Sequence, residues 1–90
     1  MALALIKVKI MPESPDTNLN EIEAKAKKIL TKQGSKSIRF EREPIAFGLI
    51  AVIVGFSWDD TQSNEEVVEE LRKIKKVSSA EVIDYRRAIG

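Results

Sequence analysis

The sequence predicts an α+β fold of element order βαββαβ, in which two helices cover one face of a four-stranded antiparallel sheet. Three observations lead to this expectation. Apolar residues recur with a period of two in some segments and with helical spacing in two others. The two halves of the chain repeat one coarse plan of strand, helix and strand. Right-handed crossovers in both halves then place the helices on the same face and the first and third strands at the centre.

The first half begins with a strand and a helix. The segment Ala2 to Met11 is apolar except for two lysines, and its alternate residues share one face. Asn18 is a typical helix N-cap, and Glu21 three places later completes a capping-box pattern. Apolar residues at helical spacing follow until Gly34, which suits a helix end because glycine adopts left-handed geometry without steric strain. The segment Lys36 to Arg42 then alternates as a second strand.

The second half repeats the plan after a connection from Pro44 to Gly48. The segment Leu49 to Phe56 is an almost unbroken apolar run rich in β-branched residues, which is typical of a central strand. A polar turn follows, and Ser63 with Glu66 repeats the capping-box pattern ahead of a second helix. A final strand is expected from about Ala80 to Arg87. Together these elements make the ferredoxin-like plan.

The composition limits what the chain can do. Ninety residues with 43% hydrophobic content suffice for one domain, residues 1–90, with a real core. Neither Cys nor His occurs, which excludes disulfides, thiolate nucleophiles, a His general base and the usual zinc sites. A net charge of +1 gives no reason to propose a nucleic acid or a membrane as partner. Lys7 and Lys9 interrupt the apolar start before it could act as a signal peptide, so we expect a soluble, cytoplasmic protein.

One face of the predicted sheet is left open, and we expect apolar residues on it. The third strand is apolar on both faces, so either the set Leu49, Ala51 and Ile53 or the alternate set faces away from the helices. We expect this set to lie beside Leu3 and Leu5 and to form an interaction surface. The alternatives are that long Lys and Arg side chains cover it or that a crystal dimer buries it.

The segment Glu43 to Gly48 is the most informative candidate site. Pro44 lacks a backbone donor and fixes the chain direction, while Gly48 permits backbone geometries closed to other residues. Ile45 and Phe47 lie between them at the predicted hairpin tip. An aromatic residue there lacks neighbours in its own domain and could anchor in a pocket of another protein. Folding back of Phe47 under its own loop is an equally weighted alternative.

Three other features have simpler explanations. Arg86 and Arg87 could reach phosphates or carboxylates, but a terminal pair of arginines is usually solvated charge. Asp59 and Asp60 lack the further ligands that a metal site needs, and supporting the start of the second helix is the simpler role. Trp58 is expected to close one end of the core. Since no nucleophile is accompanied by a base, the sequence does not predict an active site.

Three motifs of the chain resemble the archaeal translation elongation factor 1-beta family. They are the loop Met11-Pro12-Glu13-Ser14-Pro15-Asp16, the segment Glu43-Pro44-Ile45-Ala46-Phe47-Gly48-Leu49 and the ending Asp84-Tyr85-Arg86-Arg87. The resemblance covers the whole chain, and the first two motifs are the more specific ones. It implies a ferredoxin-like domain, in agreement with the element order inferred above from the residues.

The resemblance also implies a function and a partner. The function is guanine-nucleotide exchange on elongation factor 1-alpha, the GTPase that carries aminoacyl-tRNA to the ribosome. The implied partner holds GDP and Mg2+. Such a factor performs no bond chemistry of its own and needs no cofactor, no direct nucleic acid and no membrane.

The resemblance assigns roles to residues at two places. In eukaryotic relatives a Phe in the matching motif enters a pocket of the GTPase, and here that residue is Phe47. The same relatives use a Lys next to the C-terminus to disturb the magnesium and phosphate region. This chain has arginines there instead, so either one of them replaces the Lys or the mechanism differs. The expected partner-binding residues are Pro44, Ile45, Phe47, Gly48, Arg86 and Arg87.

Functions of other classes are compatible with the same fold. RNA-recognition domains share the element order, but they need exposed aromatic residues on the central strands, and the third strand offers a single Phe. A ferredoxin-like small-molecule regulatory domain would suit an apolar open face, although the strand–helix junctions lack a glycine-rich ligand loop. An enzyme of the acylphosphatase type ranks last, because the sequence lacks a suitable phosphate-binding loop.

Overall fold

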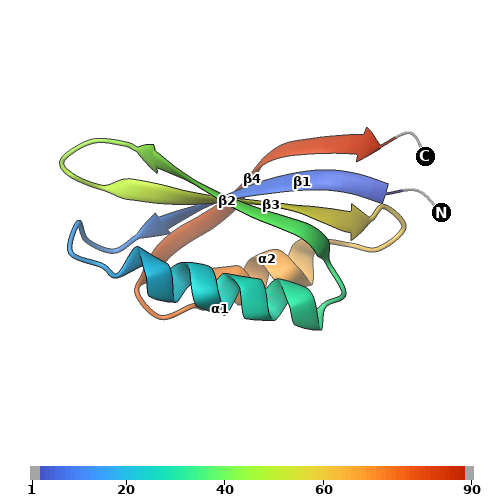
Figure 1. Ribbon diagram of the computed structural model, residues 1–90, viewed down its shortest axis with the longest axis horizontal. Coiled ribbons are helices and arrows are strands. Elements are labelled where there is room, and N and C mark those ends of the chain that lie inside the picture. Colours follow the sequence, from blue (N-terminus) through green and yellow to red (C-terminus); the bar gives the residue numbers. More distant parts are fainter. Residues whose placement is uncertain (1–2, 89–90) are drawn as a thin grey trace.

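The computed structural model describes residues 3–88 and contains four strands and two helices. Figure 1 shows both helices packed on the same side of one twisted sheet, so the fold has two layers. The predicted α+β, ferredoxin-like βαββαβ fold is thereby confirmed. The elements are β1 (Leu3–Pro12), α1 (Leu19–Lys32), β2 (Lys36–Pro44), β3 (Ile50–Asp59), α2 (Glu65–Arg72) and β4 (Val77–Ala88).

The four strands form one antiparallel sheet in the order β2–β3–β1–β4. The first and third strands are therefore central, as predicted, and β2 and β4 are the edges. The register between the central strands places Ile6 opposite Phe56 and Val8 opposite Val54. Since side chains alternate between the two faces of a strand, all four of these lie on the face that the helices cover.

The hydrophobic core lies between that face and the apolar stripes of the helices. Alternate residues of β1 and β3 are almost fully buried there. From the helix layer they meet Ile22, Ala26 and Leu30 of α1 and Val67 and Leu71 of α2. Each stripe has the three- and four-residue spacing of one helix face, which is why the sequence pattern identified both helices.

Trp58 closes the end of the core next to the turn between β3 and α2, as predicted. Its ring lies edge-on to Phe56 with the ring centres 6.1 Å apart. Its indole Nε1 donates a hydrogen bond of 3.1 Å to the backbone oxygen of Gln62. A buried indole N–H needs such a partner, so Trp58 fills the core and also holds the turn in place.

The ends of α1 follow the sequence pattern, whereas the start of α2 does not. The Asn18 side chain accepts hydrogen bonds from the backbone N–H groups of Asn20 and Glu21, and Gly34 after the helix has a φ of 86°. The predicted capping box of Ser63 is wrong. Asn64 occupies the N-cap of α2, and the Ser63 hydroxyl accepts from the backbone N–H of Glu65, only two residues further on. That short turn takes Ser63 out of the capping position.

All four strands extend further than the local pattern indicates, and the differences are largest in β3 and β4. β3 continues past Phe56 to Asp59, and β4 begins at Val77 rather than at Ala80. The reason is pairing with β1 in both cases, since Asp59 lies opposite Leu3 and Val77 opposite Pro12. A partner strand that is distant in the sequence decides where a strand ends.

The open face of the sheet is less apolar than expected. Of the two alternate sets of the third strand, the one with Ala51 and Ile53 faces away from the helices. Ala51 is nevertheless 0% and Ile53 5% exposed, because longer polar side chains of the neighbouring strands cover them. Lys9 and Glu43 are two of these covering side chains, and they form an ion pair of 3.7 Å. The expected position beside Leu3 and Leu5 is also wrong, because the antiparallel register brings Ser57 and Asp59, not Ile53, opposite those leucines.

Candidate partner-binding site

The hairpin between β2 and β3 presents Phe47 at its tip. The Ile45 N–H donates to the Leu49 carbonyl at 2.9 Å, and the Leu49 N–H donates to the Ala46 carbonyl at 2.9 Å. The two residues inside this turn both have positive φ, 55° for Phe47 and 79° for Gly48. Positive φ at both central positions defines a type I′ turn, whose twist matches that of paired strands.

The side chain of Phe47 is 96% exposed. The alternative in which it folds back under the loop is therefore wrong. A bulky residue at positive φ is uncommon and strained, and a fully exposed ring gains nothing from burial. Neither observation is explained by the stability of the fold, whereas both suit a side chain that is kept outside for a partner.

The other residues of this segment set the position of the tip. Pro44 ends β2 opposite Ile50, the first residue of β3. Ile45 is partly exposed beside the turn. A Cβ atom on Gly48 would lie 3.6 Å from the Cβ of Pro15, so the hairpin tip approaches the loop between β1 and α1. Two of the three motifs singled out in the sequence thus meet at one end of the molecule.

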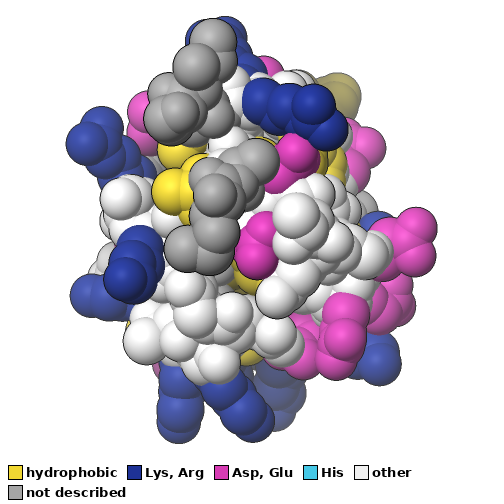
Figure 2. Space-filling view, turned by 90° about the vertical axis from the view of Figure 1, so that its right-hand side faces the viewer, with side chains coloured by type: hydrophobic (Ala, Val, Ile, Leu, Met, Phe, Trp, Pro, Cys, Tyr) yellow, Lys and Arg dark blue, Asp and Glu magenta, His cyan; other side chains and the backbone are white. Residues whose placement is uncertain are grey.

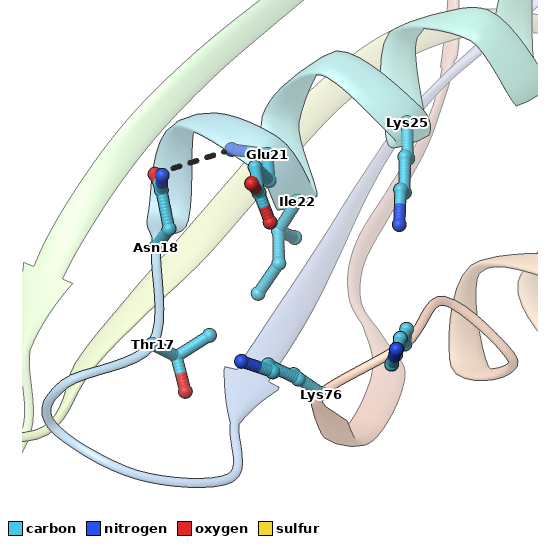
Figure 3. A pocket seen from close by; sticks show the side chains of 7 residues that line it. Thr17, Asn18, Glu21, Ile22, Lys25 and Lys76 are labelled. Atoms are coloured by element: carbon cyan, nitrogen blue, oxygen red, sulfur yellow. Dashed lines mark hydrogen bonds between the residues drawn. The ribbon is translucent and has the colours of Figure 1, made fainter.

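That loop is itself tied to the helix layer. The backbone N–H of Glu13 donates to the Lys76 carbonyl at 2.9 Å, and Ser14 bonds the hydroxyl of Thr17 through its backbone N–H. A hollow of about 190 Å³ lies between the start of α1 and the residues after α2. In Figure 3 the side chain of Lys76 extends toward Thr17, while Asn18 above them caps the helix. The first turn of α1 therefore already has a partner for its backbone donors.

The third motif lies at the opposite end of the molecule. Arg87 forms an ion pair of 2.8 Å with Asp60, whose side chain is only 8% exposed, and the hydroxyl of Tyr85 donates to the same carboxylate. Arg86, whose side chain is largely exposed, pairs at 3.2 Å with the partly exposed Asp84. The sequence did not indicate that Asp60 contacts Tyr85 and Arg87, because these residues meet only when β4 passes the turn after β3.

The two arginines point to different faces of the sheet. Arg86 lies opposite Leu5, on the open face, while Arg87 lies opposite Ala4, on the face with the helices. Figure 2 looks onto this end, where basic side chains lie at the left, the top and the bottom and acidic ones mainly at the right. The sequence prediction treated Arg86 and Arg87 as equivalent, and the fold makes them different.

The predicted contacts are therefore in two separate groups. Figure 1 shows the β2–β3 hairpin at one end of the long axis and the end of β4 at the other. The molecule is 41 Å long in this direction. A partner that touches both Phe47 and Arg86 must extend along most of the sheet.

The hydrogen bond between Tyr85 and Asp60 leads to a measurable prediction. Donation to the carboxylate raises the pKa of the Tyr85 phenol above its ordinary value of 10.0. The stabilising effect is therefore present below pH 10.0 and is lost as the pH rises through the folded-state pKa. Tyr85 is the only tyrosine of the chain, so absorbance at high pH reports its titration alone.

We expect the Asp60→Asn variant to titrate at lower pH than the unchanged protein. Asp84→Asn is the matched control, since Asp84 precedes Tyr85 in the sequence and bonds Arg86 rather than the phenol. Identical titration curves for the Asp60→Asn variant and the unchanged protein would contradict the assigned hydrogen bond.

Two other kinds of site are absent from residues 3–88. These residues contain no group of three or more acidic side chains that could hold a metal ion. In the same part of the chain, neither helix is long and apolar enough to cross a membrane. The hairpin tip and the Arg86 end remain the candidate sites.

Comparison with known families decides between the functions that this fold permits. The EF-1 guanine nucleotide exchange domain family matches residues 5–88. The chain belongs to this family. The protein named elongation factor 1-beta from Thermococcus gammatolerans is 42% identical over 77 residues, which are 83% of this chain and 84% of the relative. The elongation factor 1-beta of Methanocaldococcus jannaschii is 35% identical over 89 residues, 98% of this chain and 100% of the relative.

Among solved structures, similarity extends to the fold alone. The ACT domain from GTP pyrophosphokinase of Chlorobium tepidum superposes with a TM-score of 0.61 at 19% identity, covering 88% of this chain and 96% of that one. The match to the exchange-domain family therefore rests on the sequence, and it confirms the resemblance that the three motifs indicated.

Proposed function

We propose that this protein promotes the exchange of GDP for GTP on elongation factor 1-alpha. The observation that carries the proposal is Phe47, which is 96% exposed at a strained hairpin tip, within the part of the chain that matches the exchange-domain family. Its ring is an anchor of the kind that fills a pocket on a partner. Residues 1–90 act as one exchange domain, in the cytoplasm, with no membrane, direct nucleic acid or cofactor involved.

Exchange of this kind needs no bond chemistry. A factor that binds the nucleotide-free GTPase better than the GDP-bound form must, by reciprocal linkage, weaken GDP binding by the same factor. A coupling free energy of about 1–3 kcal/mol corresponds to roughly 5- to 150-fold. GTP then enters by mass action, because it is the more available nucleotide.

Arg86 is the better candidate for the second contact, near the magnesium and phosphates of the partner. The guanidinium of Arg87 is held by Asp60, a carboxylate that is almost buried and also bonds Tyr85. Within residues 3–88, the ion pair of Arg86 is with the partly exposed Asp84, and binding a partner would break only this pair. Arg86 also lies on the open face of the sheet. In this proposal Arg87 fastens the end of β4, and Arg86 reaches the partner.

The competing RNA-binding function is weaker in this structure. RNA-recognition domains stack bases on exposed aromatic residues of the central strands. The Phe of β3, Phe56, points into the core and is buried. Within the described parts of β1 and β3, the open face carries no aromatic side chain.

The direct test is GDP release from elongation factor 1-alpha, followed with a fluorescent GDP analogue and excess unlabelled nucleotide. We expect this protein to accelerate release in a manner that saturates as its concentration rises. Heat-denatured protein serves as the control. Unchanged release at saturating protein would overturn the proposal.

A further inference from the structure

A hollow interrupts the open face of the sheet at Gly55, in the middle of β3. Gly55 lies directly opposite Lys7 of β1 on one side and Arg39 of β2 on the other. Since glycine has no side chain, the surface is recessed between these two cations. A Cβ atom placed on Gly55 would lie 3.8 Å from the Cγ of Lys7, so the missing side chain leaves real space.

The hollow has apolar and cationic walls. It has a volume of about 330 Å³, and Leu5 contributes to its apolar part while Lys7 and Arg39 lie at its sides. A smaller hollow of about 140 Å³ adjoins it, shares Lys7, Arg39 and Gly55, and adds Ile53 and Glu41. Among the described residues, the lining of the larger hollow includes no acidic side chain, so this hollow suits a ligand with a short apolar stem and a negative end.

The two cations are available for such a ligand. Within residues 3–88, neither Lys7 nor Arg39 has an acidic group within 4.0 Å. The acidic residue opposite Lys7 is Asp84, and its carboxylate is engaged by Arg86. The neighbouring cation Lys9, by contrast, is paired with Glu43. The positive charge around Gly55 is therefore local and uncompensated by ion pairs.

We propose that this hollow receives an Asp or Glu side chain of the GTPase partner, with its carboxylate between Lys7 and Arg39. The open face of the sheet is then the surface that docks on the partner. Charge complementarity selects the carboxylate, and the apolar wall receives the stem of the same side chain. The site lies on the face that carries Arg86, between the two ends of the molecule at which the other contacts lie. This inference rests on the proposed exchange function.

Gly55→Val is the sharpest test, because it places a branched side chain between Lys7 and Arg39 without harming the strand. The backbone of Gly55 is not in a glycine-only conformation, the Cβ has ordinary contact distances, and valine favours strands. We expect a folded protein with an unchanged or higher Tm. Its affinity for elongation factor 1-alpha, measured by calorimetry, should fall roughly tenfold or more, since the carboxylate can no longer enter. An affinity equal to that of the unchanged protein would overturn the proposal.

Removing the charges tests the chemistry of the ligand independently. The double variant Lys7→Met, Arg39→Met should bind more weakly at low salt and show a smaller dependence of affinity on salt concentration. Its matched control is Lys27→Met, Lys32→Met, which removes two exposed lysines of α1 that likewise lack ion pairs in the described part of the chain. If affinity depends equally on salt concentration in the two double variants, the proposed binding of a carboxylate between Lys7 and Arg39 is overturned.

The same measurements separate this inference from the proposed function. If the wild-type protein binds and accelerates GDP release, and the variants bind equally well, only the proposed carboxylate site at Gly55 is overturned. If the wild-type protein binds without accelerating release, the exchange function is overturned. The affinities of the variants would still show whether a carboxylate binds at Gly55. Failure of the unchanged protein to bind would overturn both.

Discussion

Replacing Phe47 by Asn should nearly abolish nucleotide exchange and at the same time make the protein more stable. Loss of an aromatic anchor weakens a complex by about 2 kcal/mol or more, which is roughly 30-fold in affinity. Asn followed by Gly48 is the preferred pair for a type I′ turn, because Asn accepts positive φ better than Phe does. Relief of this strain should raise the free energy of unfolding by about 1 kcal/mol.

Two measurements check the opposite effects of this substitution. The rate of GDP release at a fixed, subsaturating protein concentration should fall, and the Tm should rise by roughly 4–8 °C. Phe47→Leu is the control, because it keeps an apolar side chain at the tip and should retain part of the activity. A stable Phe47→Asn variant that exchanges nucleotide as fast as the unchanged protein would exclude the hairpin tip as a contact.

The second large effect is on stability, at Trp58. Truncation of a buried aromatic residue to alanine costs about 3–5 kcal/mol, and Trp58→Ala also removes the indole donor to Gln62. Small domains have only about 5–15 kcal/mol in total. We therefore expect the Tm, followed by circular dichroism, to fall by more than about 12 °C.

A conservative variant separates the two roles of Trp58. Trp58→Phe keeps most of the ring and loses the hydrogen bond, so it should cost about 1 kcal/mol. Ile83→Ala is a surface control, since Ile83 is half exposed on the edge strand β4, and its effect should stay within about 0.5 kcal/mol. A Tm for Trp58→Ala close to that of Ile83→Ala would contradict the position of Trp58 in the core.

The fold was largely predictable, because most of its elements are determined by residues that are close together in the sequence. Each helix has an apolar stripe of its own, and the caps at Asn18 and Gly34 are set by one residue and its immediate neighbours. The ends of β3 and β4 were not predictable in this way. They depend on pairing with β1, and nothing near Trp58 or Val77 in the sequence states which residues lie opposite.

The candidate site shows the same division. The residues around Phe47 could be selected from the sequence, because a proline, an aromatic and a glycine in one turn are unusual together. The exposure of the Phe47 ring could not be predicted, since it depends on which other parts of the domain lie near the hairpin tip. The difference between Arg86 and Arg87 and the hollow at Gly55 also required the register, which assigns each side chain to one face.

The pairing of β1 with β4 has a consequence for how the protein is made. Leu3 at the start of β1 lies opposite Ala88 at the end of β4, so the central strand β1 cannot complete its pairing until β4 has been synthesised. During synthesis the β2–β3 hairpin can form early, because its strands are close in sequence. The completed sheet requires that Val77–Ala88 has left the ribosome. We therefore expect the sheet to be completed in one late cooperative step, once β4 is free to pair with β1.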